Sequence, residues 1–122
     1  MKNQTYRMTM LYDFYGDLLT DRQKEFYDLY YNEDLSLAEI AENHGITRQG
    51  VRDIIVRAEG TLQEVEDKTS LIRKHHAMQE ELGNLSSMVN DIRLLNLEDF
   101  HSEKLTKLCD VLEDAIGDLR KD

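Results

Sequence analysis

The chain has 122 residues, no proline and a formal net charge of −10, and a third of its residues are charged. This length suits one ordinary domain, or a small domain with an extension, and the lack of proline favours long helices over an all-β fold. The acidic balance argues against a protein that coats nucleic acid non-specifically, because such binding depends on neutralising phosphates.

The first two helices are expected near the N-terminus. Between about residues 5 and 19, helical spacing relates Leu11, Phe14, Tyr15 and Leu18. Thr20 and Gln23 have the spacing of a capping box, so a second helix is expected to begin there. That helix carries Phe26, Tyr27, Leu29, Tyr30 and Tyr31. We interpret these rings as the core of the domain, and an exposed aromatic binding patch as the alternative.

Residues 36–52 predict two short helices joined by a tight turn. Ser36 and Glu39 have capping-box spacing, Gly45 suits the reversal of the chain, and Thr47 is a good N-cap for the second helix. A helix, a turn with glycine and a second helix form the helix-turn-helix arrangement, whose second helix enters the DNA major groove.

The second helix is expected to bury Val51, Ile54 and Ala58 and to turn a polar face outward. Arginine can bond guanine, and glutamine adenine, through paired hydrogen bonds in the major groove. The predicted nucleic-acid-binding residues are Ser36, Thr47, Arg48, Gln49, Arg52, Asp53 and Arg57. Alternatively, these side chains are solvated and the helix binds protein. Ile55 and Val56 widen the apolar face, and we expect them to pack on the C-terminal part or on a partner.

A C-terminal helical hairpin is expected from two apolar stripes. The second helix of the helix-turn-helix should continue past Gly60 and break near residues 67–69, which divides the chain into a domain at 1–66 and a hairpin at 67–122. A helix over about 69–90 carries a heptad-like stripe: Leu71, His75, Met78, Leu82, Leu85, Val89 and Ile92. The last helix, about 102–119, carries Leu105, Leu108, Leu112, Ala115 and Leu119. We expect the hairpin to pack on itself and, through the first stripe, on a second copy as a homodimer.

No motif in the chain indicates catalysis or a cofactor. Adjacent His75 and His76 point about 100° apart on a helix and cannot chelate one ion together. The only cysteine, Cys109, is expected to be a small buried side chain. Neither a signal-peptide-like run nor a membrane-span-length run is present, so we expect a cytoplasmic protein without catalytic residues, metal, cofactor or membrane insertion.

The helix-turn-helix resembles region four of bacterial sigma factors, which reads an upstream promoter element. The residues that carry this similarity are 19–23, 36–41, 45–48, Val51, Arg57 and Ala58. The resemblance implicates Arg48, Gln49, Arg52 and Asp53 as reading residues. The fold we expect is therefore all-α and winged helix-like: a sigma region-four-like domain, then a hairpin with heptad-like stripes.

A closer resemblance, to the YlxM family of small bacterial helix-turn-helix proteins, covers most of the chain. It is carried by residues 12–20, 29–31, 36–42 and 48–53. The resemblance implies a regulatory or accessory role in the signal recognition particle pathway of protein targeting. Two hypotheses follow. One is a dimeric DNA-binding regulator, and the alternative is an adapter that docks on the particle's GTPase or its RNA without binding DNA.

Overall fold

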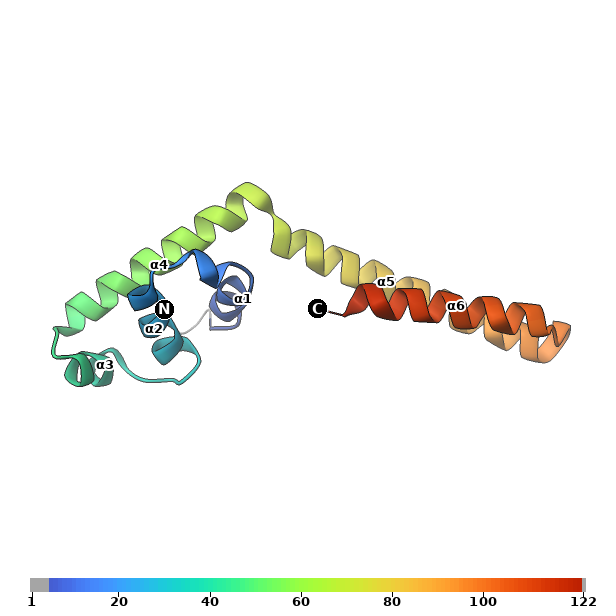
Figure 1. The fold of residues 1–122 in the computed structure, drawn as a ribbon, viewed down its shortest axis with the longest axis horizontal. Coiled ribbons are helices and arrows are strands. Elements are labelled where there is room, and N and C mark those ends of the chain that lie inside the picture. Colours follow the sequence, from blue (N-terminus) through green and yellow to red (C-terminus); the bar gives the residue numbers. More distant parts are fainter. Residues whose placement is uncertain (1–4, 122) are drawn as a thin grey trace. The chain divides into compact units, whose positions relative to one another are not determined.

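The computed structural model describes residues 5–121 and forms two compact units, one ending at Ile72 and the other beginning at Arg73 (Figure 1). The described helices are α1 (Thr5–Tyr15), the 3₁₀ turn η2 (Gly16–Leu18), α2 (Asp21–Tyr31), α3 (Leu37–His44), α4 (Arg48–Thr69), α5 (Leu71–Leu95), the π-helical turn η3 (Asn96–Phe100) and α6 (Glu103–Arg120). The predicted all-α class is confirmed. The described residues form no strand, so the domain lacks a β-wing and the winged helix-like expectation was wrong.

In the first unit, α1, α2 and α3 pack against α4. The rings of α2 supply most of the core volume, and Phe26 and Tyr27 are fully buried. Tyr27 donates a hydrogen bond to the Met8 carbonyl oxygen at 2.6 Å, and Tyr31 donates one to the Glu59 carboxylate. The predicted aromatic core is thus confirmed, although Tyr6 on α1 is 75% exposed. Burial raises the pKa of both Tyr27 and Tyr31, so both hydroxyls stay protonated as donors.

Helices α2 and α3 begin directly after the capping residues that the sequence predicts. At α2, the Thr20 hydroxyl accepts from the Gln23 amide at 3.2 Å, and the Gln23 side chain accepts from the Thr20 amide at 3.0 Å. Ser36 and Glu39 make the same reciprocal pair at α3, with both bonds at 3.1 Å. These bonds satisfy amide donors that a helix start leaves without partners, which fixes the first residue of each helix.

Helix α4 continues without a break through Gly60 and ends at Thr69, where Ser70 takes a left-handed conformation with φ of 55°. The Tyr15 hydroxyl joins this end to α1, because it donates to Glu66 at 2.6 Å and lies 2.9 Å from the Thr69 hydroxyl. The same Glu66 oxygen accepts from the Ile72 amide at 3.0 Å. The predicted break near 67–69 is therefore confirmed.

Ile55 corrects one expectation about α4. The sequence suggested that it packs on the C-terminal part or a partner, but it is fully buried in the core of the first unit. It follows Val51 by four residues and precedes Ala58 by three, so all three lie on one face of the helix. Ile54 is only partly buried beside them, and Val56 is 38% exposed.

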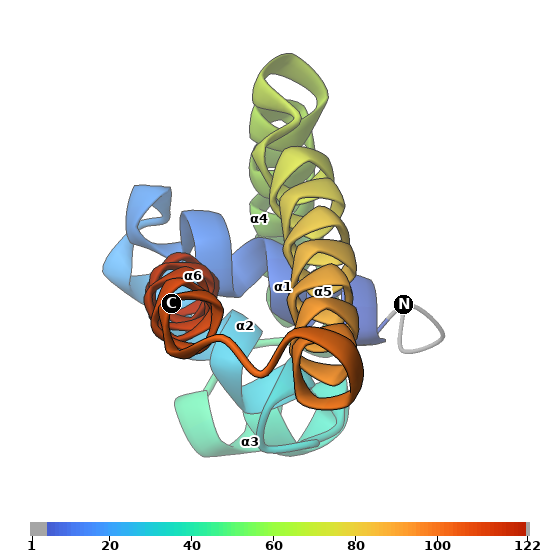
Figure 2. The ribbon, with the colours of Figure 1, turned by 90° about the vertical axis from the view of Figure 1, so that its right-hand side faces the viewer.

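The second unit is an antiparallel hairpin of α5 and α6, which lie side by side in both ribbon views (Figure 1, Figure 2). Its buried apolar residues are Leu82, Val89, Cys109 and Ile116. The buried Cys109 confirms the expectation for that residue. Of the predicted heptad stripe on α5, the hairpin buries Leu82 and Val89, whereas His75 is half-buried and Leu71, Met78, Leu85 and Ile92 are exposed.

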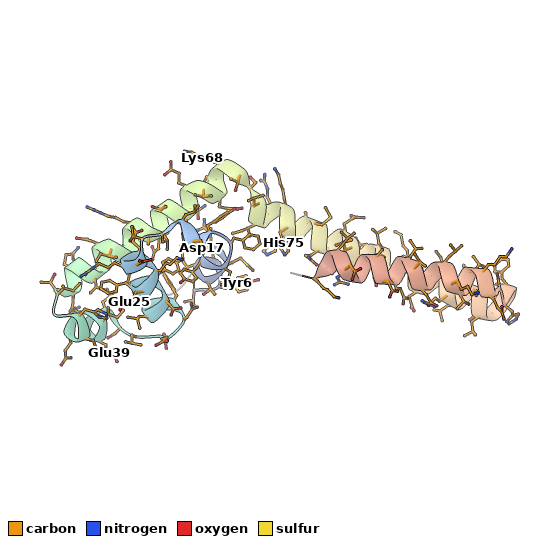
Figure 3. The ribbon with its side chains drawn as sticks, viewed as in Figure 1. Tyr6, Asp17, Glu25, Glu39, Lys68 and His75 are labelled. Carbon is orange, nitrogen blue, oxygen red and sulfur yellow. The ribbon has the colours of Figure 1, made fainter. Side chains whose placement is uncertain are left out.

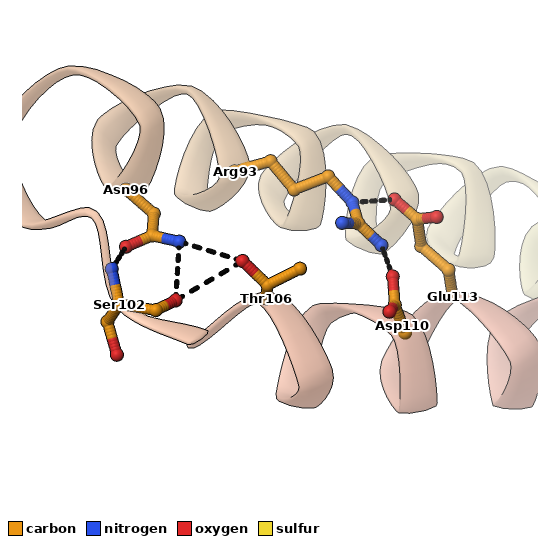
Figure 4. Close-up of polar contacts among 6 residues, drawn as sticks. All are labelled: Arg93, Asn96, Ser102, Thr106, Asp110 and Glu113. Atoms are coloured by element: carbon orange, nitrogen blue, oxygen red, sulfur yellow. Dashed lines mark hydrogen bonds and ion pairs between the residues drawn. The ribbon is translucent and has the colours of Figure 1, made fainter. Parts of the chain in front are cut away.

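Polar contacts secure the turn and one side of the hairpin (Figure 4). The Asn96 amide nitrogen donates to the Ser102 carbonyl at 2.9 Å, and the Asn96 side-chain oxygen accepts from the Ser102 amide at 2.7 Å. Arg93 pairs with Asp110 and Glu113, each at 2.6 Å, and these bonds raise the pKa of its guanidinium. Asn96 is buried and its side-chain amide has hydrogen-bond partners, so it stabilises the turn and is not a candidate ligand-binding residue.

Candidate nucleic-acid interface

Helices α3 and α4 form the predicted helix-turn-helix, and the local chemistry of the turn sets their arrangement. Gly45 takes a left-handed conformation with φ of 65°, which glycine adopts without a steric penalty. Ile46 packs against the core, and the Thr47 hydroxyl accepts from the Gly50 amide at 2.9 Å. The chain therefore reverses within a few residues and starts α4 with its first turns exposed.

Gly50 has a structural role that sequence reasoning missed. A Cβ atom at this position would lie 3.1 Å from the Thr47 hydroxyl, closer than such atoms usually approach. Its absence leaves room for the cap that begins α4. Thr47 was predicted to contact nucleic acid, but its hydroxyl accepts the hydrogen bond that forms this cap.

The first two turns of α4 present the predicted reading residues. Arg48, Gln49, Arg52 and Asp53 are all exposed. Arg48 and Arg52 are four residues apart and so share one side of the helix. The Gln49 amide donates to Asp53 at 2.9 Å, so this pair occupies one of the amide's donor groups. The two guanidinium groups are therefore the main donors that this surface offers to an incoming ligand.

Arg48 also lines a shallow cleft of about 350 Å³ between α4 and the start of α3. Ser36, Leu37 and Ala38 line the same cleft, together with the acidic residues Asp34 and Glu39. Ser36 and Arg48 thus line one cleft, although the Ser36 hydroxyl already accepts from the Glu39 amide in the α3 cap. Arg57 lies elsewhere: it follows Arg52 by five residues, which turns it about 140° around the helix.

A histidine behind the turn is a second feature that the sequence analysis did not identify. His44, the last residue of α3, places one ring nitrogen 3.0 Å from the Ile40 carbonyl and the other 2.9 Å from the Glu25 carboxylate (Figure 3 labels Glu25). Both acceptors are oxygens, so both nitrogens donate only when the ring is protonated. Accordingly, the bond to Glu25 and then the one to Ile40 raise the pKa of His44 above its ordinary value.

This pair predicts a pH-dependent contribution of His44 to stability. A pKa that is raised by folding stabilises the protein fully below the unfolded pKa of about 6.5, and the effect is lost as pH rises through the folded pKa. His44→Gln should therefore lower the free energy of unfolding more at about pH 5.5 than at about pH 8.5. Urea titrations at both pH values measure this difference. In a Glu25→Gln background the pH dependence should shrink, and an unchanged dependence would argue against the pairing.

The remaining histidines form no metal site in the part of the chain that the structure describes. No three His, Cys, Asp or Glu side chains converge there in a way that could hold an ion. The rings of His75 and His76 lie 6.1 Å apart and are tilted by 53°. None of the described helices combines the length and the apolar character that crossing a membrane requires.

Comparisons with known proteins support the helix-turn-helix. Residues 2–108 match UPF0122, the YlxM / p13-like helix-turn-helix proteins. A UPF0122 protein of Caldanaerobacter subterraneus subsp. tengcongensis is 44% identical over 89 residues, which span 73% of this chain and 76% of the relative. One from Bacillus thuringiensis is 42% identical over 98 residues, spanning 80% and 89%. One from Desulforamulus reducens is 46% identical over 85 residues, 70% of each chain.

Proposed function

The chain belongs to the UPF0122 family of YlxM / p13-like helix-turn-helix proteins, and from this premise we propose that it is a non-catalytic regulatory protein that binds DNA through the first turns of α4. The observation that carries the proposal is the pair of exposed arginines, Arg48 and Arg52, one turn apart at the start of the second helix. Recognition helices contact base edges from this position.

The arginines act as the reading residues in this proposal. Each guanidinium can donate two parallel hydrogen bonds to a guanine in the major groove. The Gln49–Asp53 hydrogen bond orients Gln49 beside them and leaves its side-chain oxygen as an acceptor. Ser36 lines the same cleft as Arg48, but its hydroxyl and its amide are both engaged with Glu39 in the α3 cap. Direct reading of base edges by the arginines is the mechanism we infer.

The distribution of charge along the chain limits the proposed DNA contact to α4. Residues 47–58 hold three arginines and one acidic residue, whereas the whole chain carries a net charge of −10. A single reading helix on an acidic protein gains little from non-specific phosphate attraction. We therefore propose that the protein acts as a homodimer, so that two reading helices engage one site.

A selection from genomic DNA tests the proposal. The full chain is mixed at low salt with sheared genomic DNA from its own organism, and the retained fragments are sequenced. We expect a small set of fragments to be enriched over input. Recovery without any enrichment would contradict a reading function, because non-specific binding retains all fragments alike.

The second candidate is an adapter that docks on the signal recognition particle GTPase or its RNA. The net charge of −10 favours this candidate, since an acidic protein suits a basic protein partner better than it suits free nucleic acid. Purification of the tagged chain from a lysate with and without nuclease separates the two. Recovery of the GTPase after nuclease treatment would favour the adapter. Recovery of nucleic acid alone, lost after nuclease, would favour DNA or RNA binding.

A further inference from the structure

The side of α4 that faces away from the core has a regular composition. The buried residues of this helix recur with helical spacing: Val51, Ile55, Ala58 and Leu62. Two positions before the first three of them stand the exposed residues Gln49, Asp53 and Val56. Two positions correspond to a rotation of about 200°, so these side chains lie nearly opposite the core. Together with the exposed Arg52 they form what we call the outward strip.

The spacing within the outward strip is that of a helix that reads the major groove. Counted from Gln49, the other three members follow after three, four and seven residues. In the homeodomain, residues at these same intervals on the recognition helix contact base edges. A surface for base recognition on α4 therefore reaches Val56, which lies one turn beyond Arg52.

Val56 gives the outward strip an apolar group at one end. It is 38% exposed, and no other large apolar side chain of α4, a helix that the structure describes in full, is as exposed. Each base pair presents a distinct pattern of groups in the major groove, and the C5-methyl group of thymine is the apolar element of that pattern. An aliphatic side chain at this position of a recognition helix therefore matches thymine.

Asp53 gives the outward strip a carboxylate, which the phosphates of bound DNA repel. A carboxylate on such a surface lowers the affinity for DNA in general, and it contributes to binding only where a base offers a hydrogen-bond donor. The Gln49 amide donates to Asp53 at 2.9 Å, which orients the carboxylate and leaves further lone pairs on its oxygens. Cytosine offers an amino group in the major groove, and aspartate and glutamate are the side chains that accept from it.

We propose that the outward strip selects two of the bases in the DNA site: Asp53 accepts a hydrogen bond from a cytosine amino group, and Val56 contacts a thymine methyl group. This inference rests on the proposed DNA-reading function and deepens it, because it names bases that α4 selects besides guanine. The two residues lie about 4.5 Å apart along the helix axis, and the bases of one strand stack about 3.4 Å apart. The cytosine and the thymine therefore belong to neighbouring base pairs, or to pairs separated by one.

Replacing thymine by uracil tests the Val56 contact, because uracil lacks only the methyl group. The full chain is titrated by fluorescence anisotropy with a selected genomic fragment in which one thymine at a time is replaced. When the contacted thymine is replaced, the wild type should bind about four-fold more weakly, which is the effect of one buried methyl group. In Val56→Ala the same replacement should change the affinity less than about two-fold. An equal uracil effect in both proteins, or none in the wild type, would contradict the Val56 contact.

Replacing C·G pairs by T·A pairs tests the Asp53 contact, because thymine presents an oxygen where cytosine presents its amino group. At one position near the contacted thymine, this change should weaken wild-type binding about ten-fold, and Asp53→Ala should bind both fragments alike. Asp67→Ala is the matched control and should keep the wild-type preference. Asp67 accepts from Gln63 at 2.7 Å in the same type of pair, but fourteen residues further along α4. A cytosine preference that survives Asp53→Ala, or that Asp67→Ala also removes, would refute the Asp53 contact.

The failure of this inference can be distinguished from the failure of the proposed function. Asp53 and Val56 are both exposed, so the variants should stay folded, and melting curves check this. A wild type that prefers no fragment would overturn the proposed function and this inference with it. A selective wild type whose base preferences neither substitution changes would overturn this inference alone.

Discussion

Replacing Ile55 by alanine is expected to lower the free energy of unfolding of the first unit by about 3 kcal/mol. Ile55 is fully buried among the side chains of α1, α2 and α4, and its truncation removes apolar contacts and leaves a cavity. The chain offers a direct readout: it has no tryptophan, and all six tyrosines lie at or before Tyr31. Tyrosine fluorescence during urea denaturation therefore reports on the first unit alone.

Val56→Ala is the matched control for that substitution. Val56 is the next residue and is 38% exposed, so its truncation should cost less than about 1 kcal/mol. The contrast separates a core role for Ile55 from a role in binding a partner. Similar losses for both variants, or a small loss for Ile55→Ala, would contradict the burial of Ile55 in the core.

The second large effect is expected at the reading residues of α4. Removing both guanidinium groups in an Arg48→Ala/Arg52→Ala variant should weaken binding to a selected DNA fragment about 100-fold, since each paired contact to a base contributes about 1–3 kcal/mol. Fluorescence anisotropy of a labelled fragment measures the affinity. The melting curve of the variant should match that of the wild type, because both side chains are exposed.

Arg57→Ala provides the control for charge. It removes one positive charge from the same helix but on a side turned about 140° away from Arg52. We expect a change in affinity of less than about three-fold for this variant, consistent with the loss of a distant phosphate attraction. If Arg57→Ala weakened binding as much as Arg52→Ala alone, binding would depend on general charge rather than on the proposed reading face.

The helix boundaries of the first unit could be predicted because short-range chemistry determines them. Thr20 with Gln23, and Ser36 with Glu39, close their capping boxes within three residues. Gly45 occupies a backbone conformation that few other residues tolerate. Such signals depend on neighbours in the sequence, so they hold whatever the tertiary structure is.

Features that depend on distant residues could not be predicted in this way. The burial of Ile55 depends on how α1 and α2 cover α4, and the apolar face of α4 is wide enough to allow either interpretation. The bond between His44 and Glu25 joins residues 19 apart in sequence. In the hairpin, the leucines are the most regular apolar pattern of α6, yet Cys109 and Ile116 are the residues buried against α5. Packing against α5 determines which side of α6 is buried, and the sequence of α6 alone does not contain that information.

The proposed DNA-reading function is tested most directly by the specificity of the intact chain. The affinity for a selected genomic fragment is compared with that for a scrambled fragment of equal length, at several salt concentrations, for the wild type and the Arg48→Ala/Arg52→Ala variant. We predict that the wild type prefers the selected fragment at every salt concentration, and that the variant binds both fragments equally and weakly. A variant that keeps the wild-type preference, or a wild type that shows none at low salt, would contradict DNA reading by α4.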